Sequence, residues 1–300
     1  MVLNYCCVMD NRAAIRQFLV TRRAKLRPED TGLPDFGGVR RVPGLRREEV
    51  ALLAGVSVEY YTRLERGGRA GASDSVLEGL ARGLHLNEAE RQHLYDLARA
   101  AGPAPHASPR KRGKVSASLQ RLLDGMPGIP AFIRNGRLDV LAINALGQML
   151  YSEAFVNPDR PVNLARFCFL DAGAHRLYPD WQKAAETSVA LLDTETGRDP
   201  GNSEMAELVA ELSDRSEEFR ALWARHDVRL HQSGYKEFRH PAVGDLQLSF
   251  NALTLPAEPG LTLTALSAEP NTPSESGMQR LIELVHGTAT PVSAPAGVSR

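Results

Sequence analysis

The sequence predicts a two-domain chain, an all-α domain followed by a mixed α/β domain. Helix-type apolar spacing dominates the first hundred residues, a basic stretch rich in Pro and Ser interrupts it, and alternating apolar residues typical of strands appear afterwards. The expected parts are an N-terminal extension at 1–10, a five-helix domain at 11–101, a linker at 102–115, an α/β domain at 116–270 and a largely disordered tail at 271–300.

Length and composition agree with this division. Three hundred residues with 43% hydrophobic and 24% charged content describe a globular chain that can bury sizeable cores. The net charge is zero, but residues 1–114 carry 20 Lys and Arg against 13 Asp and Glu, whereas residues 115–300 carry 16 against 23. A polyanionic partner is therefore expected at the front half alone.

The cysteines and the termini indicate a reducing compartment. Cys6, Cys7 and Cys168 have neither the number for a disulfide framework nor a metal-ligand spacing. The N-terminus has no cationic leader, and no apolar run reaches the length of a membrane span. We therefore expect a cytoplasmic, nucleoid-associated protein with no metal and no cofactor, and without a membrane partner.

The front domain shows start signals for its outer helices. Asn11 can cap the first helix, and Ser73 or Asp74 begins the fourth. Asn87 and Glu90 stand at capping-box spacing at the start of the fifth. Together with a helical pair in between, these signals predict five helices.

The stretch from Leu45 to Gly67 has the pattern of two short helices joined by a tight turn. Val50 and Ala54 share one helical face. Gly55 can adopt the left-handed conformation that ends a helix, and Ser57 can cap the next one. This is the layout of a helix-turn-helix, whose second helix enters the DNA major groove.

This stretch resembles the helix-turn-helix of the phage-repressor type, also called the xenobiotic-response-element (XRE) type. The matching residues are Arg47, Ala51, Gly55, Val56, Ser57, Tyr61, Thr62, Glu65 and Gly67. Arg47 is also a departure, since many members carry Gln there, although either side chain can reach a phosphate. The resemblance implies base reading by Val58, Glu59, Tyr60 and Arg63, and phosphate contacts by Arg47, Ser57 and Arg66.

A Gly- and Pro-rich loop before the motif adds further candidates for phosphate contacts. Arg40 and Arg41 lie in this loop, and Arg46 and Arg47 follow at a helix start. Cationic side chains and the N–H groups of a helix N-terminus both attract anions. A solvated insertion explains Arg40 and Arg41 equally well.

The rear domain opens with a short helix at 118–126 and a β-hairpin around Asn135-Gly136, a strong hairpin signal. Its order of elements predicts a mixed α/β domain. Helices are expected at 145–151, 163–170, 179–196 and 204–226, strands at 235–240, 245–255 and 261–268, and a short helix in the tail at 278–285.

Several separate blocks, among them FIRNGRLDVLAINALG, FLDAGAHRLYPDW and RSEEFRALWARHDVR, are similar to the MmyB-like ligand-binding domain. The resemblance covers about residues 116–270. It implies a PAS-like sensor fold whose apolar pocket accepts a fatty-acid-like or other lipophilic small molecule, in an actinobacterial-type regulator that works as a dimer.

Candidate ligand-binding residues follow from this resemblance. The large apolar side chains are core residues in the first instance, and a subset is expected to line a pocket. Arg220 or His226 is the candidate for the polar head of the ligand, while a solvated or ion-paired helix face is the alternative explanation. The candidates are Phe132, Leu141, Ile143, Phe167, Phe169, Trp181, Phe219, Arg220, Trp223, His226 and Phe250.

Enzymatic activity is not expected, because the usual signatures for acyl transfer, zinc hydrolysis, nucleotide hydrolysis and dinucleotide binding are missing. His226 with Asp227, His231 and His240 suggests a metal or acid–base cluster, but structural imidazoles are the more frequent explanation.

We therefore predict a sequence-specific transcription regulator that binds a palindromic operator in double-stranded DNA as a homodimer. Its rear domain is expected to sense a lipophilic, fatty-acid-like molecule. The alternative is a DNA-binding protein whose rear domain is only a dimerisation or partner-binding module without a ligand.

Overall fold

The computed structural model describes residues 11–33, 44–66, 72–100, 115–156, 161–199, 201–226 and 232–288. The chain divides into two compact units. The first comprises Met1–Lys111 and Ala185–His231, and the second comprises Arg112–Ala184 and Gln232–Arg300. The boundary at Ala184 and Ala185 falls inside the long helix α10 (Trp181–Arg198), which therefore contributes to both units.

The front part of the first unit is helical, as expected. Its elements are α1 (Asn11–Lys25), the 3-10 helix η1 (Pro28–Thr31), α2 (Arg47–Ala54), α3 (Val58–Glu65), α4 (Asp74–Gly83) and α5 (Glu88–Ala100). Their apolar faces meet in one core, which includes Phe18, Leu19, Leu45, Val50, Tyr61, Leu80 and Leu94. The five α-helices predicted for this region are confirmed.

The turn between α2 and α3 has the predicted chemistry. Gly55 has φ +70° at the end of α2, a left-handed conformation that costs glycine little. The hydroxyl of Ser57 accepts a hydrogen bond from the Tyr60 amide at 3.1 Å and so caps α3. Asn87 and Glu90 form the predicted reciprocal capping box at α5, with bonds of 2.9 and 3.0 Å.

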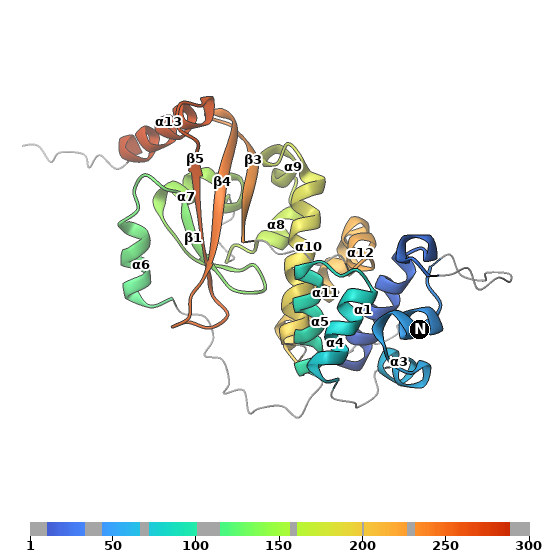
Figure 1. Ribbon diagram of the computed structural model, residues 1–300. Coiled ribbons are helices and arrows are strands. Elements are labelled where there is room, and N and C mark those ends of the chain that lie inside the picture. Colours follow the sequence, from blue (N-terminus) through green and yellow to red (C-terminus); the bar gives the residue numbers. More distant parts are fainter. Residues whose placement is uncertain are drawn as a thin grey trace, which may run out of the picture. The chain divides into compact units, whose positions relative to one another are not determined.

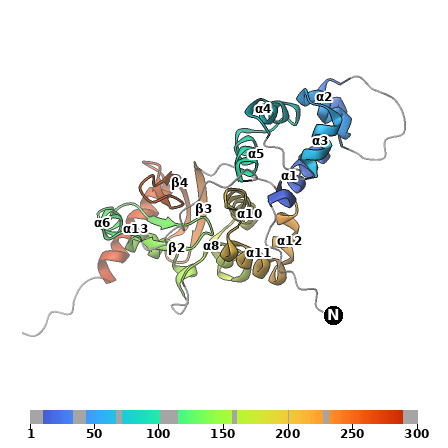
Figure 2. The same ribbon diagram turned by 90° about the horizontal axis from the view of Figure 1, so that it is seen from below.

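Helix α2 crosses α4 at very short range because glycines stand at the crossing. A Cβ at Gly79 would lie 2.4 Å from the carbonyl oxygen of Ala54, and one at Gly83 would lie 2.9 Å from Cβ of Leu53. Figure 2 shows α2, α3 and α4 as neighbours. The small residues thus fix how α2 sits in the domain, and α2 in turn supports α3.

The second unit contains a five-stranded sheet with the order β2-β1-β5-β4-β3, and every neighbouring pair in it is antiparallel. Figure 1 shows β5, β4 and β3 side by side. The strands are β1 (Ala131–Arg134), β2 (Val140–Ile143), β3 (Ser233–His240), β4 (Gly244–Thr254) and β5 (Thr262–Ala268). The strands predicted in this part of the chain are confirmed within about two residues at each end.

Helices cover both faces of this sheet. They are α6 (Ala117–Asp124), α7 (Ala145–Leu150), the 3-10 helix η2 (Ser152–Phe155), α8 (Leu164–Leu170), α9 (Gly173–Leu177) and α13 (Pro273–Thr288). We call the inner face the one that carries Phe132, Phe238 and Phe250, because it packs with α7, α8, α9 and α13 into the larger core. The opposite face carries Ile133 and Leu263, which pack with Leu123 of α6.

The hairpin was predicted correctly, but its turn is longer than the Asn-Gly pair suggests. The bonds of the turn run from Asn135 to Asp139, where the Asn135 amide donates to the Asp139 carbonyl at 3.2 Å. The positive φ of 67° falls on Leu138 and not on Gly136. Hydrogen bonds between Asn135 and Asp139 that involve their side chains stabilise this wider turn, and the chain therefore does not form the two-residue turn.

The single helix expected over 204–226 is wrong, because two helices occupy this range. They are α11 (Ser203–Arg215) and α12 (Glu217–Trp223), and Ser216 between them is extended with φ −131° and ψ 122°. The Ser216 hydroxyl accepts a hydrogen bond from the Phe219 amide at 3.0 Å. Ser216 therefore caps the start of α12, and α11 does not continue through it.

The short helix expected at 278–285 in the tail is confirmed, but the disorder expected around it at 271–300 is wrong for Pro273–Thr288, which form the 16-residue helix α13. Met278 and Leu281 are buried in the inner-face core, with Ile282 and Val285 packed beside them. This spacing of three and four residues makes one apolar stripe, which outweighs the polar composition of the segment. The last residues, 289–300, lie outside the described part of the chain.

Candidate DNA-binding and ligand-binding sites

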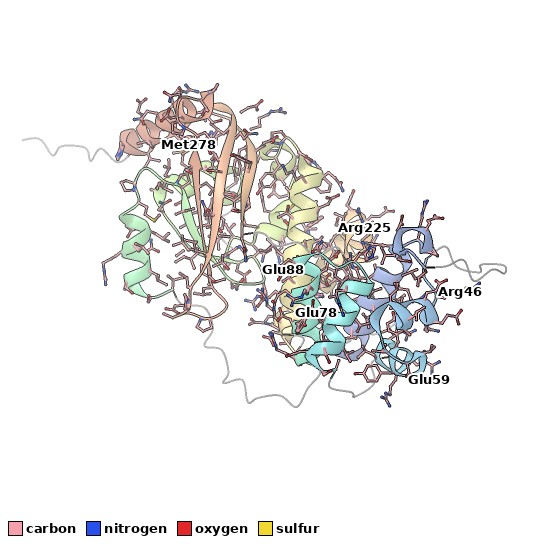
Figure 3. All side chains as sticks on the ribbon, in the orientation of Figure 1. Arg46, Glu59, Glu78, Glu88, Arg225 and Met278 are labelled. Atoms are coloured by element: carbon pink, nitrogen blue, oxygen red, sulfur yellow. The ribbon has the colours of Figure 1, made fainter. Side chains whose placement is uncertain are left out.

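Helix α3 divides cleanly into a buried and an exposed side. Tyr61 and Leu64 are 0% and 5% exposed and hold the helix on the core. Val58, by contrast, is 41% exposed, and Glu59 and Arg63 are exposed as well. Figure 3 shows Glu59 on the outer side of the helix. The expected base-reading residues therefore occupy the outward face of α3.

Tyr60 and Arg66, two further residues expected to contact DNA, are also at least partly exposed. Tyr60 is partly buried, and the guanidinium carbon of Arg63 lies 5.4 Å from the centre of its ring. This cation–π contact supports the long Arg63 side chain without burying it. Arg66 is exposed just after the helix. An exposed guanidinium of this kind can form a bidentate pair with a guanine edge or bind a phosphate.

Glu65 at the end of α3 is a residue whose structural role the sequence analysis missed. Its side chain is 1% exposed and pairs with Arg23 at 3.0 Å and with Arg47 at 2.8 Å. The hydrogen bond to Glu65, together with charge attraction, raises the pKa of Arg47. Glu65 thereby connects α1, α2 and α3. The position of its carboxylate next to the apolar Leu64 was the one sequence signal that could have indicated this buried role.

Arg47, a predicted phosphate contact, is consequently held by Glu65 while its side chain remains 47% exposed. The backbone N–H of Arg46 is bonded to the Glu49 carboxylate at 2.6 Å, so this amide is not open to a phosphate. The Arg46 side chain is partly exposed beside Glu48. Arg40 and Arg41 lie outside the described residues.

The predicted ligand-binding residues separate between the two units. Phe132, Ile143, Phe167, Trp181 and Phe250 belong to the inner-face core of the second unit. Phe169 makes an edge contact with Trp181 at 6.0 Å, whereas Leu141 packs in the smaller core on the opposite face. Phe219, Arg220, Trp223 and His226 lie in the first unit.

The two polar candidates for the ligand head group both have partners within the first unit. Arg220 is exposed and donates to the Ser213 carbonyl at 2.5 Å. His226 is buried, and its Nδ1 lies 3.1 Å from both carboxylate oxygens of Asp193. The carbonyl of His226 also accepts a hydrogen bond from Arg22 of α1. These bonds give both residues a structural role.

The histidines do not form one cluster in the described part of the chain. His240 accepts a bond from the Ala242 amide at Nδ1, so its Nε2 donates to the Met149 carbonyl at 3.0 Å. His226 pairs with Asp193 instead. Over the described ranges no three metal-binding side chains gather in one place, and no helix has the length and apolarity of a membrane span. Asp227 and His231 lie outside these ranges.

Three polar side chains on or beside the inner face were not among the predicted site residues. Arg134 of β1 is 8% exposed, Tyr151 after α7 is 2% exposed, and Lys236 of β3 is partly buried. Burial, with a smaller contribution from the charge of Arg134, lowers the pKa of Lys236 to about 8. The alternation of Lys236 with buried Phe238 was the signal that could have placed it inward.

Comparison with known families agrees with this division of roles. Residues 18–94 match the family described as helix-turn-helix domain, and residues 115–281 match the family described as MmyB-like transcription regulator ligand binding domain. None of the curated proteins matched the chain. Both matched families are regulatory, and the second match spans more than half of the chain. The chain therefore belongs to the family of transcription regulators with an MmyB-like ligand-binding domain.

Proposed function

We propose that this protein is a one-component transcription regulator of the cytoplasm and its nucleoid. It binds a palindromic operator as a homodimer through α3, and its C-terminal domain senses a lipophilic, fatty-acid-like molecule. The observation that carries the DNA-binding part is the outward face of α3, where Val58, Glu59 and Arg63 are exposed while Tyr61 and Leu64 anchor the helix.

The geometry of DNA recognition supports the proposed dimer. A single eight-residue recognition helix such as α3 covers only a few base pairs. Two copies related by a two-fold axis would read half-sites one helical turn apart, about 34 Å. A ligand that changes the spacing of the two helices would then change operator affinity.

The sensor role is supported by the make-up of the second unit. The antiparallel order β2-β1-β5-β4-β3 is compatible with the PAS-like fold that the resemblance implies. Its inner face is lined by aromatic and aliphatic side chains, including Phe132, Phe167 and Phe250. Sites for small molecules are mostly apolar with a few polar groups, and this face has that composition.

Contacts inside the first unit join helices that belong to the ligand-binding family match to helices of the DNA-binding region. The region matched by the ligand-binding family includes α11, α12 and the end of α10. Arg22 of α1 bonds both Glu90 of α5 and the carbonyl of His226 after α12. Arg198 of α10 also lies 3.4 Å from Asp96 of α5. A shift of these helices would therefore act directly on α1 and α5.

Operator selection with the full chain, followed by a comparison of two arginine variants, tests the DNA-binding proposal. Arg63→Ala should cost about 1–3 kcal/mol on the selected operator and relax specificity at one base pair. Arg66→Ala, which removes an equally exposed guanidinium outside the base-reading set, should weaken selected and random DNA alike. Equal losses on both DNAs for both variants would refute this division of roles.

Native mass spectrometry of the purified full chain separates the sensor from the ligand-free module. A co-purified lipophilic molecule, or one taken up from a lipid extract, supports sensing. A protein that stays empty after incubation with such an extract, yet still binds its operator, would make the rear domain a module for dimerisation or for a protein partner.

A further inference from the structure

A buried polar cluster in the first unit joins α1 and α5 of the DNA-binding region to α10 and the residues after α12. We call it the histidine junction, and its members are Arg22, His93, Asp193 and His226, all of which are buried. The first two lie in the range matched by the helix-turn-helix family and the last two in the range matched by the ligand-binding family. Charged and titratable side chains are rarely buried together, so this cluster calls for an explanation.

Helix α10 contacts both histidines of the junction with one face. Asp193 and Gly197 are four residues apart on α10 and therefore lie on the same side of it. The carboxylate of Asp193 lies 3.1 Å from Nδ1 of His226. A Cβ at Gly197 would lie only 2.7 Å from Nδ1 of His93, so the ring of His93 packs directly on the backbone of α10.

Helix α1 contacts the same two histidines from its own side. The ring of Phe18 lies 5.1 Å from that of His93, in edge contact. Arg22, one turn later on α1, bonds both the Glu90 carboxylate of α5 and the carbonyl of His226. The contacts of α1, α5 and α10 thus form a closed circuit, in which the loss of one contact exposes the others.

Both imidazoles have a buried nitrogen that lacks a hydrogen-bond partner in the described part of the chain. These atoms are Nδ1 of His93 and Nε2 of His226. In an ionised imidazole both nitrogens carry a proton and need acceptors. Protonation of His93 would therefore place a charge and an unpaired N–H against the backbone of Gly197, which disfavours the closed junction.

Four charged or titratable groups act on His93 from its own helix and from the elements packed around it. They are Asp96 of α5, Arg22 of α1, Asp193 of α10 and His226. The two carboxylates favour a proton on the ring, but Asp193 already bonds His226, and Asp96 lies 3.4 Å from Arg198. Burial has the largest effect and lowers the pKa of His93 below the ordinary value of 6.5.

We propose that the histidine junction is a proton-operated latch, which holds α1 and α5 on α10 at neutral pH and opens when His93 is protonated in mild acid. The proposal rests on the proposed function, because the latch regulates the same DNA-binding helices. Helix α10 continues into the second unit, so a closed latch restrains the motion of the DNA-binding helices relative to it. An open latch leaves more motion to be lost on binding, and operator affinity should therefore fall.

Hydrogen exchange of the full chain at pH 7.5 and pH 5.5 measures the latch directly, after correction for the intrinsic dependence of exchange on pH. An open form with the ordinary pKa of 6.5 binds the proton more readily, so acid favours opening by up to about tenfold at pH 5.5. Amides around His93 and Gly197 should lose protection severalfold at the lower pH. Amides of β4 in the sheet should keep theirs.

Two variants change the latch in opposite directions. His93→Phe keeps an aromatic ring that cannot be protonated, so its exchange around Gly197 should not respond to pH. Gly197→Ala introduces a methyl group against the His93 ring and should open the latch at pH 7.5 already. The matched controls are His286→Gln, at an exposed histidine of α13, and Gly287→Ala, at a glycine with open space around it. Unchanged protection of β4 shows that each variant is folded.

Operator affinity, measured by fluorescence anisotropy at constant ionic strength, is the second readout. Between pH 7.5 and pH 5.5 the wild-type protein should lose affinity severalfold relative to His93→Phe. This ratio cancels the effect of protonation elsewhere on the protein and the DNA. Gly197→Ala should bind the operator more weakly than Gly287→Ala at pH 7.5.

The outcomes separate the latch from the proposed function. Exchange around Gly197 that does not respond to pH in the wild-type protein, or that responds equally in His93→Phe, would overturn the latch whether or not an operator is found. A latch that opens in acid while wild-type and His93→Phe proteins keep equal operator affinity would overturn its regulatory role. Failure to select any operator would overturn the proposed function alone, because hydrogen exchange needs no DNA.

Discussion

The region of α3 and the inner face of the sheet differ in how a charged side chain turned toward the core is paired. Behind α3, the buried carboxylate of Glu65 pairs with Arg23 and Arg47, although the buried hydroxyl of Tyr61 on the same helix has no hydrogen-bond partner among the described residues. On the sheet, the Tyr151 hydroxyl and Lys236 face an apolar core, and in the described part of the chain neither has a hydrogen-bonding or ion-pairing partner.

This difference bears on the stability of the free protein. DNA is large and rigid, so its reader must be complete before binding and must hold its helix in place with satisfied contacts. A buried polar group without a partner, by contrast, destabilises the free protein. Substitutions at these two kinds of polar group should therefore have opposite effects on stability.

The largest effect is expected at Glu65. Glu65→Ala removes the carboxylate that two arginines share, and breaking a buried pair in this way costs about 3 kcal/mol. Denaturant unfolding of the full chain, monitored through the helical signal, measures this loss. Glu59→Ala on the exposed side of the same helix is the control and should change stability by less than about 1 kcal/mol. Similar losses in both variants would contradict the role given to Glu65.

The opposite sign is expected at Tyr151. Tyr151→Phe removes a buried hydroxyl without a partner, so the ligand-free protein should gain about 1 kcal/mol of unfolding free energy. Thermal unfolding measures the gain. Tyr235→Phe, at an exposed position on β3, should be neutral within about 0.5 kcal/mol. A clear loss of stability in ligand-free Tyr151→Phe would show that the hydroxyl has a partner in the protein.

The smallest effect is expected from His93 of α5, which packs against Phe18 at 5.1 Å. Burial lowers its pKa below the ordinary value of 6.5, and Asp193, Asp96, His226 and Arg22 act on it more weakly. Because the unfolded chain binds this proton more readily, stability should decrease as the pH falls below about 6.5.

His93→Phe should flatten this part of the stability profile, and denaturant unfolding between pH 7.5 and pH 5 measures the slope. His286→Gln, which changes an exposed histidine of α13, is the control and should leave the slope as it is. An unchanged slope in His93→Phe would mean that other groups cause the acid sensitivity.

The two regions also differ in how well the sequence predicts them. The helical pair follows from local rules, since Gly55 ends α2, Ser57 caps α3 and Asn87 caps α5, each through neighbours in sequence. The family match and the helices confirm this architecture. The contact residues on α3 remain a prediction, although the structure exposes most of them.

In the rear domain the strands were predictable from alternation, but the burial of three polar side chains was not. Arg134, Tyr151 and Lys236 are separated by up to about a hundred residues, and local sequence patterns did not indicate that these side chains are buried or partly buried. Sequence analysis favoured Arg220 and His226. Arg220 bonds Ser213 across the helix break at Ser216, and His226 pairs with Asp193, which lies 33 residues earlier in the chain. Arg220 and His226 as ligand-binding residues therefore stay a prediction, because tertiary pairing decides the role of such polar groups.

The most direct test of ligand-responsive DNA binding is the operator affinity of the full chain, measured by fluorescence anisotropy with and without saturating laurate. Linkage requires a ligand that regulates binding to change this affinity, and a coupling of about 1–3 kcal/mol corresponds to about a 5- to 150-fold shift. We expect such a shift in the wild-type protein. Identical operator titrations with and without bound laurate in the wild-type protein would contradict the account.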